Sequence, residues 1–546
     1  MSQDDVPAIV VTAGEDNVLV KGRLLYPERG PSRFASRMAK AAVVAGRAAG
    51  PARLFLVPSP CLWYGVAELL EDLPSDGAVL CIETDPALAN LAEKRMPAAI
   101  AADPRLRFVP GEDRGAWIAA AAALGRFRRV MPTRLSGGSD LEPAALREAI
   151  ALLDEEFASY WKNRASLAAM GRLWMRNIFR NLARMEDIAP LPLPRVAGPT
   201  VVCGAGPSLE VALPFIRKNR KSLNVVAADT AVKSLVAADI VPDLVVCLEA
   251  QIWNLRDFIG VTGLGFAVLA DLSYHPDSFG VSPSANLLSG VRIVDGPFLD
   301  RLHNSGLPLL LAPPLGSVGV HALHVARRLG AAPCFVSGLD FAFPPGKTHV
   351  RGSPAVAADA HSSSRLAPIG SRPLEIAYRE GVRTVREGGD QLTDPVLSRY
   401  AALMSEEIAL HGPPVYDIRA GRGIPLGAPI LDFDDFVGSL GGPAPTGITR
   451  AARAGMGFEG DASAISRNFM ETELKRLVSL EELLRGGRRT AAADLAKAIG
   501  DLDYLLWPMP DAERLASLPQ DLLNRVLVET EYWIAQLRNL AYYRVQ

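Results

Sequence analysis

The sequence has few cysteines, no excess of either charge and no long apolar run. Five cysteines stand among 546 residues, a small and odd number that favours buried free thiols in the cytoplasm over a disulfide framework. A net charge of −2 provides no general attraction to nucleic acid or anionic lipid. The most apolar stretches, such as residues 307–311, are short and broken by proline, so we expect no membrane insertion. The acidic residues 1–5 predict no secretory signal.

What the sequence does contain is a repeated alternation of short apolar runs and helical patterns. This alternation predicts an α/β fold whose central domain is a doubly wound, Rossmann-like parallel sheet. At 546 residues the chain is long enough for three or four domains. We predict a smaller N-terminal α/β domain (1–150), a helical connector with a proline-rich linker (151–194), the central α/β domain (195–438) and an all-α C-terminal domain (439–546).

The N-terminal domain shows the pattern of an open parallel sheet, with strands predicted at residues 53–57, 78–82 and 106–109. Glu83 follows the second strand, where a dinucleotide-binding or methyltransferase-like sheet holds a ribose. The loop after the first strand, Pro58-Ser59-Pro60-Cys61, has no glycine. A backbone cradle for a cofactor is therefore not expected, and we predict a structural or docking domain.

The central domain opens on an apolar run, residues 201–203, that leads into a glycine turn and then a helical pattern. Gly204 and Gly206 let backbone N–H groups approach an anion, and the following helix dipole favours negative charge. Pro207 stops the strand, and Ser208 is a suitable N-cap. The turn thus predicts a phosphate site, although a Gly-x-Gly turn can also be no more than a tight turn.

Four acidic residues, Asp229, Glu249, Asp271 and Asp340, each follow a predicted strand of the central domain. Because ligands of doubly wound sheets sit beyond the carboxyl ends of the strands, these residues predict a polar pocket. The alternative is that each is a turn former or helix cap. Further strands are predicted at residues 292–294 and 309–311. Residues 343–372 predict a lid or binding loop, or else a disordered insertion.

The C-terminal region is predicted to consist of helices, at residues 469–484, 490–506, 512–518 and 522–543. Their apolar faces fit the core of a helical bundle, and a docking surface for a protein substrate is the alternative.

Several of these segments together resemble the central domain of the motility accessory factor (Maf) family. They are Gly204-Ala205-Gly206-Pro207-Ser208-Leu209, Ala228-Asp229, Pro242-Asp243 with Glu249-Ala250-Gln251, Gly316-Ser317-Val318, and the run from Gly338-Leu339-Asp340 to Lys347-Thr348-His349. Members of this family are bacterial proteins that resemble sialyltransferases and attach nonulosonic acids to flagellin. The same core also resembles an archaeal pterin diphosphokinase (MptE-like).

The resemblance implies a CMP-activated nonulosonic acid as the donor substrate. The turn at residues 204–208 and Gly316-Ser317 would hold the CMP portion, and residues 340–349 would close over the donor. The other residues that it places in the donor pocket are Asp229, Glu249, Gln251, Asp271, Lys347 and Thr348. The chain departs from the family at Glu249, where many members have aspartate, and at Leu339, where many have glutamine.

The resemblance also implies an inverting displacement in which a serine or threonine hydroxyl of flagellin attacks the anomeric carbon. Small bacterial sialyltransferases have a catalytic histidine downstream, but the matching residues 390–394 contain none. His349 is then the first candidate for the general base, with His361 or Asp394 in reserve and Asp340 also expected in the catalytic group. As the alternative, His349 binds a phosphate oxygen or only packs in its loop.

No motif in the sequence demands a metal, although carboxylates at the rim could hold Mg²⁺ through water. Two other functions remain open on the same core. One is a nucleotide-dependent phosphotransferase of the pterin diphosphokinase kind, which needs ATP and Mg²⁺. The other is a non-catalytic flagellin chaperone or adaptor whose helical ends bind the partner.

Overall fold

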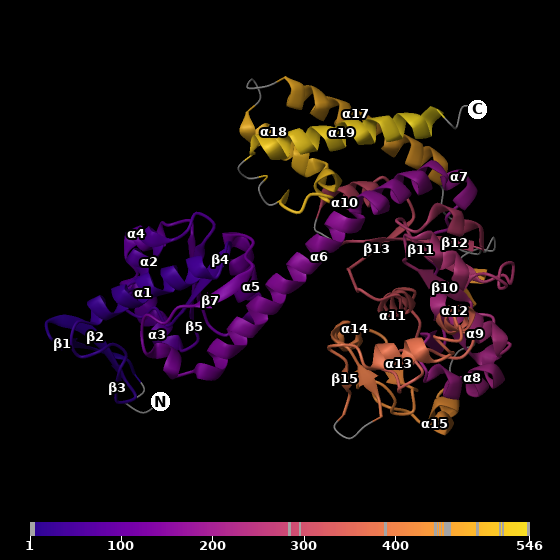
Figure 1. The fold of residues 1–546 in the computed structure, drawn as a ribbon, viewed down its shortest axis with the longest axis horizontal. Coiled ribbons are helices and arrows are strands. Elements are labelled where there is room, and N and C mark those ends of the chain that lie inside the picture. The colour runs from indigo at the N-terminus through magenta and orange to yellow at the C-terminus, as the bar shows by residue number, and fades with distance from the viewer. Residues whose placement is uncertain are drawn as a thin grey trace. The chain divides into compact units, whose positions relative to one another are not determined.

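The computed structural model describes residues 6–281, 285–293, 296–386, 390–441, 445, 447–448, 450–451, 460–486, 491–512, 515 and 518–542. The chain divides into two compact units, Met1–Ser166 and Leu167–Gln546 (Figure 1). The division falls inside helix α6 (Pro143–Ala183), which covers most of the predicted connector. The finer domain bounds at residues 150, 194 and 438 stay predictions.

The first unit contains a small antiparallel sheet and a four-stranded parallel sheet of order β6-β5-β4-β7. Its strands are β1 (Ala8–Thr12), β2 (Glu15–Val20), β3 (Arg23–Leu24), β4 (Arg53–Pro58), β5 (Ala78–Glu83), β6 (Leu106–Pro110) and β7 (Arg129–Pro132). Its helices are α1 (Pro31–Ala48), α2 (Val66–Asp72), α3 (Pro86–Arg95), α4 (Ala98–Ala101), α5 (Arg114–Leu124) and the first part of α6. The predicted parallel sheet is present.

Both faces of this parallel sheet are buried, which is why its strands are continuous apolar runs. Side chains alternate between the faces with a period of two. Phe55 and Val57 therefore belong to one core, while Leu54 and Leu56 belong to the other.

The second unit is built on eight parallel strands in the order β13-β12-β11-β10-β9-β8-β14-β17. They are β8 (Thr200–Cys203), β9 (Asn224–Ala228), β10 (Leu244–Cys247), β11 (Ala267–Asp271), β12 (Ala285–Val291), β13 (Leu309–Ala312), β14 (Cys334–Ser337) and β17 (Val415–Asp417). A short antiparallel pair, β15 (Arg383–Thr384) and β16 (Leu392–Thr393), lies outside this sheet. The helices are the rest of α6, α7 (Met185–Ile188), α8 (Leu209–Lys218), α9 (Val232–Ala237), α10 (Pro297–Asn304), α11 (Val318–Arg328), α12 (Pro354–His361), α13 (Ser371–Ala377), α14 (Pro395–Ala409), α15 (Phe433–Gly438), α17 (Ala462–Arg485), α18 (Ala492–Asp501) and α19 (Gln520–Tyr542).

The C-terminal helices share a core with one face of the eight-stranded sheet. Helices α17 and α19 run side by side (Figure 1). Phe469 and Trp533 from these helices belong to the same hydrophobic cluster as Val201 and Val225 of the sheet. The predicted fold class, a doubly wound α/β domain preceded by a smaller α/β domain and followed by helices, is confirmed.

Some predicted elements differ from the structure. Strand β12 was missed because Asn286, Ser289 and Gly290 interrupt its apolar pattern. The predicted strand at residues 292–294 is wrong at residues 292 and 293, which lie just past the end of β12 and are not in a strand. Residue 294, residues 442–444 of the predicted linker and part of the predicted helix at 512–518 lie outside the described residues.

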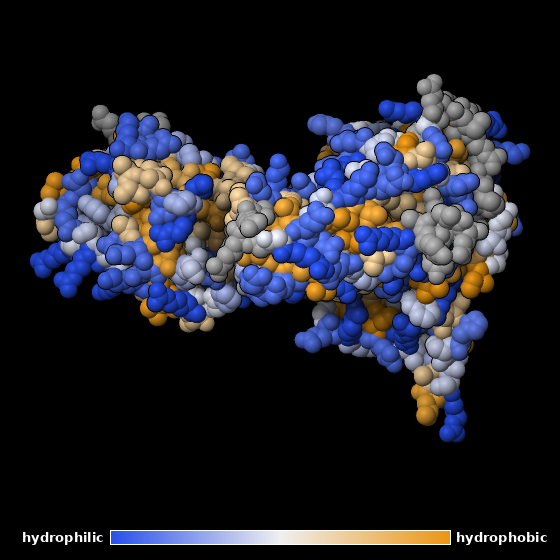
Figure 2. Space-filling model, turned by 90° about the horizontal axis from the view of Figure 1, so that it is seen from above, coloured by the Kyte–Doolittle hydropathy of each residue, from blue (hydrophilic) through white to orange (hydrophobic). Residues whose placement is uncertain are grey.

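The thiols fit the expectation from composition. All five cysteines are free and buried. The hydrophobic residues visible in Figure 2 are scattered among hydrophilic ones. Within the described parts of the chain, no helix combines the length and the apolar character needed to cross a bilayer.

A buried histidine in α11 predicts a loss of stability in acid. His321 is 0% exposed, neither ring nitrogen has a hydrogen-bond partner among the described residues, and burial lowers its pKa to about 4. The unfolded chain, with a His pKa of about 6.5, therefore binds more protons between pH 6.5 and pH 4. His321 should cost about 3 kcal/mol of stability as the pH falls through this window.

The measurement is urea unfolding of wild type and His321→Leu at pH 7 and pH 4.5. Relative to wild type, the free energy of unfolding of His321→Leu should be higher at pH 4.5 than at pH 7. His361→Gln, at an exposed position, serves as the control. Subtracting the free energy of unfolding of one protein from that of the other removes the contribution of carboxyl groups such as Asp229. The raised pKa of Asp229 makes stability increase as the pH falls, which is opposite to the effect of His321. A pH-independent difference would contradict the prediction.

Candidate functional site

A cleft with about 370 Å³ of free space opens at the carboxyl ends of β8 and β14. Strand β8 is the first strand of this sheet in the sequence. In the sheet, β9 to β13 lie on one side of it, and β14 and β17 lie on the other. The crevice between β8 and β14 is thus the topological switch point, where doubly wound sheets bind their ligands. The cleft is lined by Gly204, Ala205, Gly206, Ala228, Thr230, Ser317, Val318, Gly319, Gly338, Leu339, Asp340, Phe341, Ala342, Phe343, Thr348, His349, Ile376, Arg379, Asp394, Val396, Leu397 and Tyr400.

The glycine turn after β8 packs against the turn after β14. Gly204 N donates to Ser337 O at 2.9 Å, and Gly206 N donates to Gly338 O at 2.7 Å. A Cβ on Gly206 would lie 2.5 Å from Asp340 Oδ2, and one on Gly204 would collide with the carbonyl oxygen of Gly338. These glycines therefore permit two backbone turns to touch.

This packing corrects the expectation that the turn offers free N–H groups to a phosphate. The N–H groups of Gly204 and Gly206 already bind protein carbonyls, and Ser208 N donates to Asp340 Oδ2 at 2.8 Å. The Ser208 hydroxyl accepts from Gly338 N at 3.0 Å and makes no capping bond to α8. Neither Pro207 nor Ser208 lines the cleft.

The N-terminus of α11 is the better anion site in this cleft. Ser317 caps the helix by accepting from Gly319 N at 3.3 Å, and Ser317, Val318 and Gly319 line the cleft. The first turn has no acidic residue, so the helix dipole faces the cleft without local negative charge. Gly316, with φ of 68°, forms the turn that leads into the helix and lies outside the lining.

Asp340 lines this cleft and has a buried carboxylate oxygen without a protein partner among the described residues. The residue is 3% exposed; Oδ2 accepts from Ser208 N, while Oδ1 has no hydrogen-bond partner among the described residues. Burial raises the pKa of the carboxyl group, although its bonds to Ser208 and the charge of Arg419 work in the opposite direction. Asp340 can therefore accept a hydrogen bond from a ligand hydroxyl.

His349 lines the same cleft as a neutral imidazole. Burial lowers its pKa, and its Nδ1 lies 3.0 Å from the hydroxyl of Thr348, which also lines the cleft. The next residue holds this stretch beside the glycine turn, because Val350 N donates to Ala205 O at 2.9 Å. A neutral imidazole in this place can take up a proton.

Asp394 lines the cleft, but its carboxylate is already engaged. Oδ1 caps α14 by accepting from Val396 N at 2.9 Å and Leu397 N at 2.8 Å, and Oδ2 pairs with Arg379 at 2.7 Å. His361 is exposed on α12 and lies outside the lining. Among the three candidate bases, His349 is the best placed.

The other acidic residues at the strand ends have structural partners and do not line the cleft. Asp229 accepts from Asn254 Nδ2 at 2.9 Å and from Thr230 N at 2.8 Å, and burial raises its pKa to about 6. Asp271 accepts from Val291 N at 2.8 Å, which ties β11 to the end of β12. Of the four acidic residues predicted to cluster on one rim, Asp229, Glu249, Asp271 and Asp340, the cleft lining contains Asp340, and Asp229 lies between two lining residues.

Three further predicted donor residues also lie outside the lining. Glu249 and Gln251 are exposed, and Gln251 N donates to Glu249 Oε1 at 3.0 Å. The ammonium of Lys347 pairs with Glu210 on α8 at 2.6 Å, so its charge is directed at a carboxylate.

Sequence reasoning missed the wall formed by α13 and α14. Ile376, Arg379, Val396, Leu397 and Tyr400 line the cleft there. No motif marks these residues, because they stand more than 30 positions after the Gly338–Asp340 turn and only the fold brings them to it. Among the described residues, no three His, Cys, Asp or Glu side chains are grouped so that they could hold a metal ion.

Known proteins are similar to this chain over its centre and over its whole length. Residues 174–346 match the family model of 6-hydroxymethylpterin diphosphokinase MptE-like proteins. The solved Maf glycosyltransferase from Magnetospirillum magneticum AMB-1 has the same fold, with a TM-score of 0.56 and 13% identity over 98% of this chain and 92% of that one.

Sequence relatives come from Treponema pallidum (strain Nichols). One uncharacterized protein is 26% identical over 98% of this chain and 95% of its own length. Another uncharacterized protein is 32% identical, over 24% of this chain and 36% of its own length. The chain is Maf-like in its fold and carries an MptE-like domain at its centre, as its motifs predicted.

Proposed function

We propose that this protein is a cytoplasmic glycosyltransferase that transfers a nonulosonic acid, of the pseudaminic or legionaminic type, from a CMP-activated donor to serine or threonine residues of flagellin. The observation that carries the proposal is the cleft at the β8–β14 switch point. It combines a helix N-terminus suited to a phosphate with a neutral histidine and an unpartnered carboxylate oxygen. Likeness to the fold of a Maf glycosyltransferase supports it.

The cleft residues can perform an inverting displacement. The acceptor hydroxyl gives its proton to His349 as its oxygen attacks the anomeric carbon. The bond from that carbon to the CMP phosphate breaks, and CMP leaves with the electron pair. The α11 N-terminus stabilises the charge that develops on the phosphate, while Asp340 Oδ1 accepts a hydrogen bond from a sugar or acceptor hydroxyl.

The direct test incubates the purified full chain with flagellin and CMP-linked pseudaminic or legionaminic acid, and then measures the intact mass of flagellin. The proposal expects mass increments of whole nonulosonic acid residues that depend on the donor. Flagellin binding without any mass increment would point to an adaptor and contradict transfer.

A charge change at the α11 cap tests the phosphate subsite. Ser317→Asp keeps a good N-cap but places a negative charge at the helix end that faces the cleft. We expect donor and CMP affinity to fall at least tenfold, with the melting temperature retained. Ser317→Asn, which also caps well and is neutral, is the matched control. Equal loss of CMP affinity in both variants would remove the electrostatic argument.

A second candidate function is a phosphotransferase of the pterin diphosphokinase kind. The match of residues 174–346 to the MptE-like family model favours it. It requires ATP with Mg²⁺, and it predicts that ATP stabilises the chain against heat more than CMP does. The glycosyltransferase proposal predicts the reverse order.

A further inference from the structure

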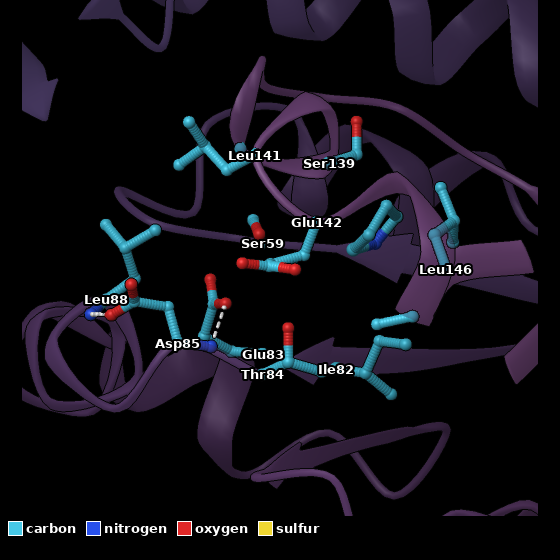
Figure 3. A pocket seen from close by; sticks show the side chains of 13 residues that line it. Ser59, Ile82, Glu83, Thr84, Asp85, Leu88, Ser139, Leu141, Glu142 and Leu146 are labelled. Carbon is cyan, nitrogen blue, oxygen red and sulfur yellow. Dashed lines mark hydrogen bonds between the residues drawn. The ribbon is translucent and has the colours of Figure 1, made fainter. Parts of the chain in front are cut away.

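The pockets at the strand ends of the two units differ in what they can hold. In the first unit, the pocket at the carboxyl ends of β4 and β5 has about 20 Å³ of free space, which is room for about one water molecule. Figure 3 shows the carboxylates of Glu83 and Glu142 and the hydroxyl of Ser59 turned toward this small space. The cleft of the second unit, with about 370 Å³, is within the usual range for small-molecule sites. A ligand as large as a nucleotide-linked sugar therefore has to be recognised by the side chains of the cleft.

One side chain with a permanent positive charge lines this cleft. Among the described residues of the lining, Arg379 is the one lysine or arginine, and burial keeps His349 neutral by lowering its pKa. The carboxylates that line the cleft are those of Asp340 and Asp394. Besides the N–H groups at the start of α11, Arg379 is therefore the group of the cleft that attracts an anion.

Asp394 holds the guanidinium of Arg379 without using all of its donors. Asp394 Oδ1 is fixed by the N–H groups of Val396 and Leu397 at the start of α14, and Oδ2 accepts from Arg379 Nη2 at 2.7 Å. Among the described residues the guanidinium makes no other hydrogen bond, although it carries further N–H donors in a planar fork. The side chain of Arg379 is 58% exposed, so these donors are open to a ligand in the cleft.

Arg379 belongs to the same wall of the cleft as the turn before α11. Its partner Asp394 begins α14, and Tyr400 of this helix also lines the cleft. A Cβ on Gly316, in the turn before α11, would lie 3.0 Å from the ring of Tyr400. The first turns of α14 thus connect Arg379 with the turn that leads into α11. A ligand whose phosphate meets the α11 N-terminus can present a second anionic group to Arg379.

A nonulosonic acid donor carries two anionic groups at its reacting end. The anomeric carbon bears both the bond to the CMP phosphate and a carboxylate, and the two oxygens of a carboxylate match the fork of an arginine. We propose that Arg379 binds the carboxylate of the nonulosonic acid and so selects acidic sugars over neutral ones. The inference rests on the glycosyltransferase function proposed above. A carboxylate held in this way also restricts rotation of the sugar about its bond to the phosphate.

The test measures, by calorimetry on the full chain, the binding of CMP and of CMP-linked legionaminic and pseudaminic acid. Arg379→Gln should weaken donor binding at least tenfold and leave CMP affinity within about twofold of wild type, because CMP has no sugar carboxylate. Arg372→Gln is the matched control, since Arg372 is an exposed arginine on α13 that pairs with Asp359 outside the lining. It should leave both affinities unchanged.

Two further variants separate the carboxylate contact from a general change of charge. Arg379→Lys keeps the charge but loses the fork, so it should show a smaller loss of donor affinity than Arg379→Gln. The double variant Arg379→Gln with Asp394→Asn keeps a good N-cap on α14 and leaves no unpaired carboxylate. It should lose as much donor affinity as Arg379→Gln alone. Thermal unfolding reports whether each variant is folded.

A donor whose sugar carboxylate is replaced by a carboxamide completes the test. It should bind wild type and Arg379→Gln equally, because the contact that distinguishes the two proteins is missing. The inference is overturned if Arg379→Gln binds the acidic donor as tightly as wild type, or if the variant loses CMP or carboxamide affinity by the same factor as donor affinity. If wild type still transfers the sugar to flagellin in that case, the proposed function stands; if wild type binds no acidic donor, both fail.

Discussion

Replacing His349 by glutamine should lower the rate of the proposed sugar transfer about 10²–10⁴-fold, which is the usual contribution of a positioned general base. Glutamine occupies similar space but cannot take up the proton of the acceptor hydroxyl. Because the step that fails is proton transfer, CMP affinity and thermal stability should stay at wild-type levels. The measurement is single-turnover transfer to flagellin, followed by intact mass.

The matched control for this variant is His361→Gln, since His361 is exposed on α12 and does not line the cleft. Burial lowers the pKa of His349 below the usual value of about 6.5, so the wild-type enzyme should keep its base neutral at pH 7. Its rate should fall only at pH values below 6.5, as His349 becomes protonated. If the His349→Gln variant transferred sugar at the wild-type rate, another group would have to take up the proton. Asp340, whose Oδ1 has no protein partner among the described residues, would be the next candidate.

The largest expected effect on folding is that of Arg419→Met. Arg419 is 1% exposed; its guanidinium pairs with Asp417 through Nε at 3.0 Å and Nη2 at 2.6 Å, and Nη1 donates to Leu339 O at 2.8 Å. Methionine fills part of the space but leaves the buried Asp417 carboxylate without its charged partner. Breaking a buried ion pair from one side costs about 3–5 kcal/mol.

Urea unfolding at pH 7 measures this cost, with the exposed Arg422→Met as the control that should change stability by less than about 0.5 kcal/mol. Because Arg419 also holds the carbonyl of Leu339, the variant should loosen the Gly338–Asp340 turn and weaken donor binding under conditions in which it is still folded. Should Arg419→Met unfold at the wild-type urea concentration, the ion pair would contribute no net stability and the turn would have another support.

The sequence alone determined the architecture of both units. Continuous apolar runs such as residues 201–203 and 244–247 have to be buried on both faces, and the helical patterns between them require parallel strands. It also indicated the turn at Gly204 and Gly206, but as a cradle for an anion; the structure shows that these glycines let two backbone turns touch. Asp340 was predicted from its place after a strand and His349 through the family resemblance, and both line the cleft.

Tertiary structure decided which groups are free to act. The N–H groups of Gly204 and Gly206 are used in turn-to-turn bonds, Lys347 is paired with Glu210, and Asp394 caps a helix. Apart from the Asp394 cap, which is local, these partners are far apart in sequence, so no local pattern could reveal that they satisfy one another. Only the folded chain shows that Asp340 Oδ1 has no protein partner among the described residues and that the α11 N-terminus faces the cleft without an acidic residue, because hydrogen-bond satisfaction depends on contacts between distant segments.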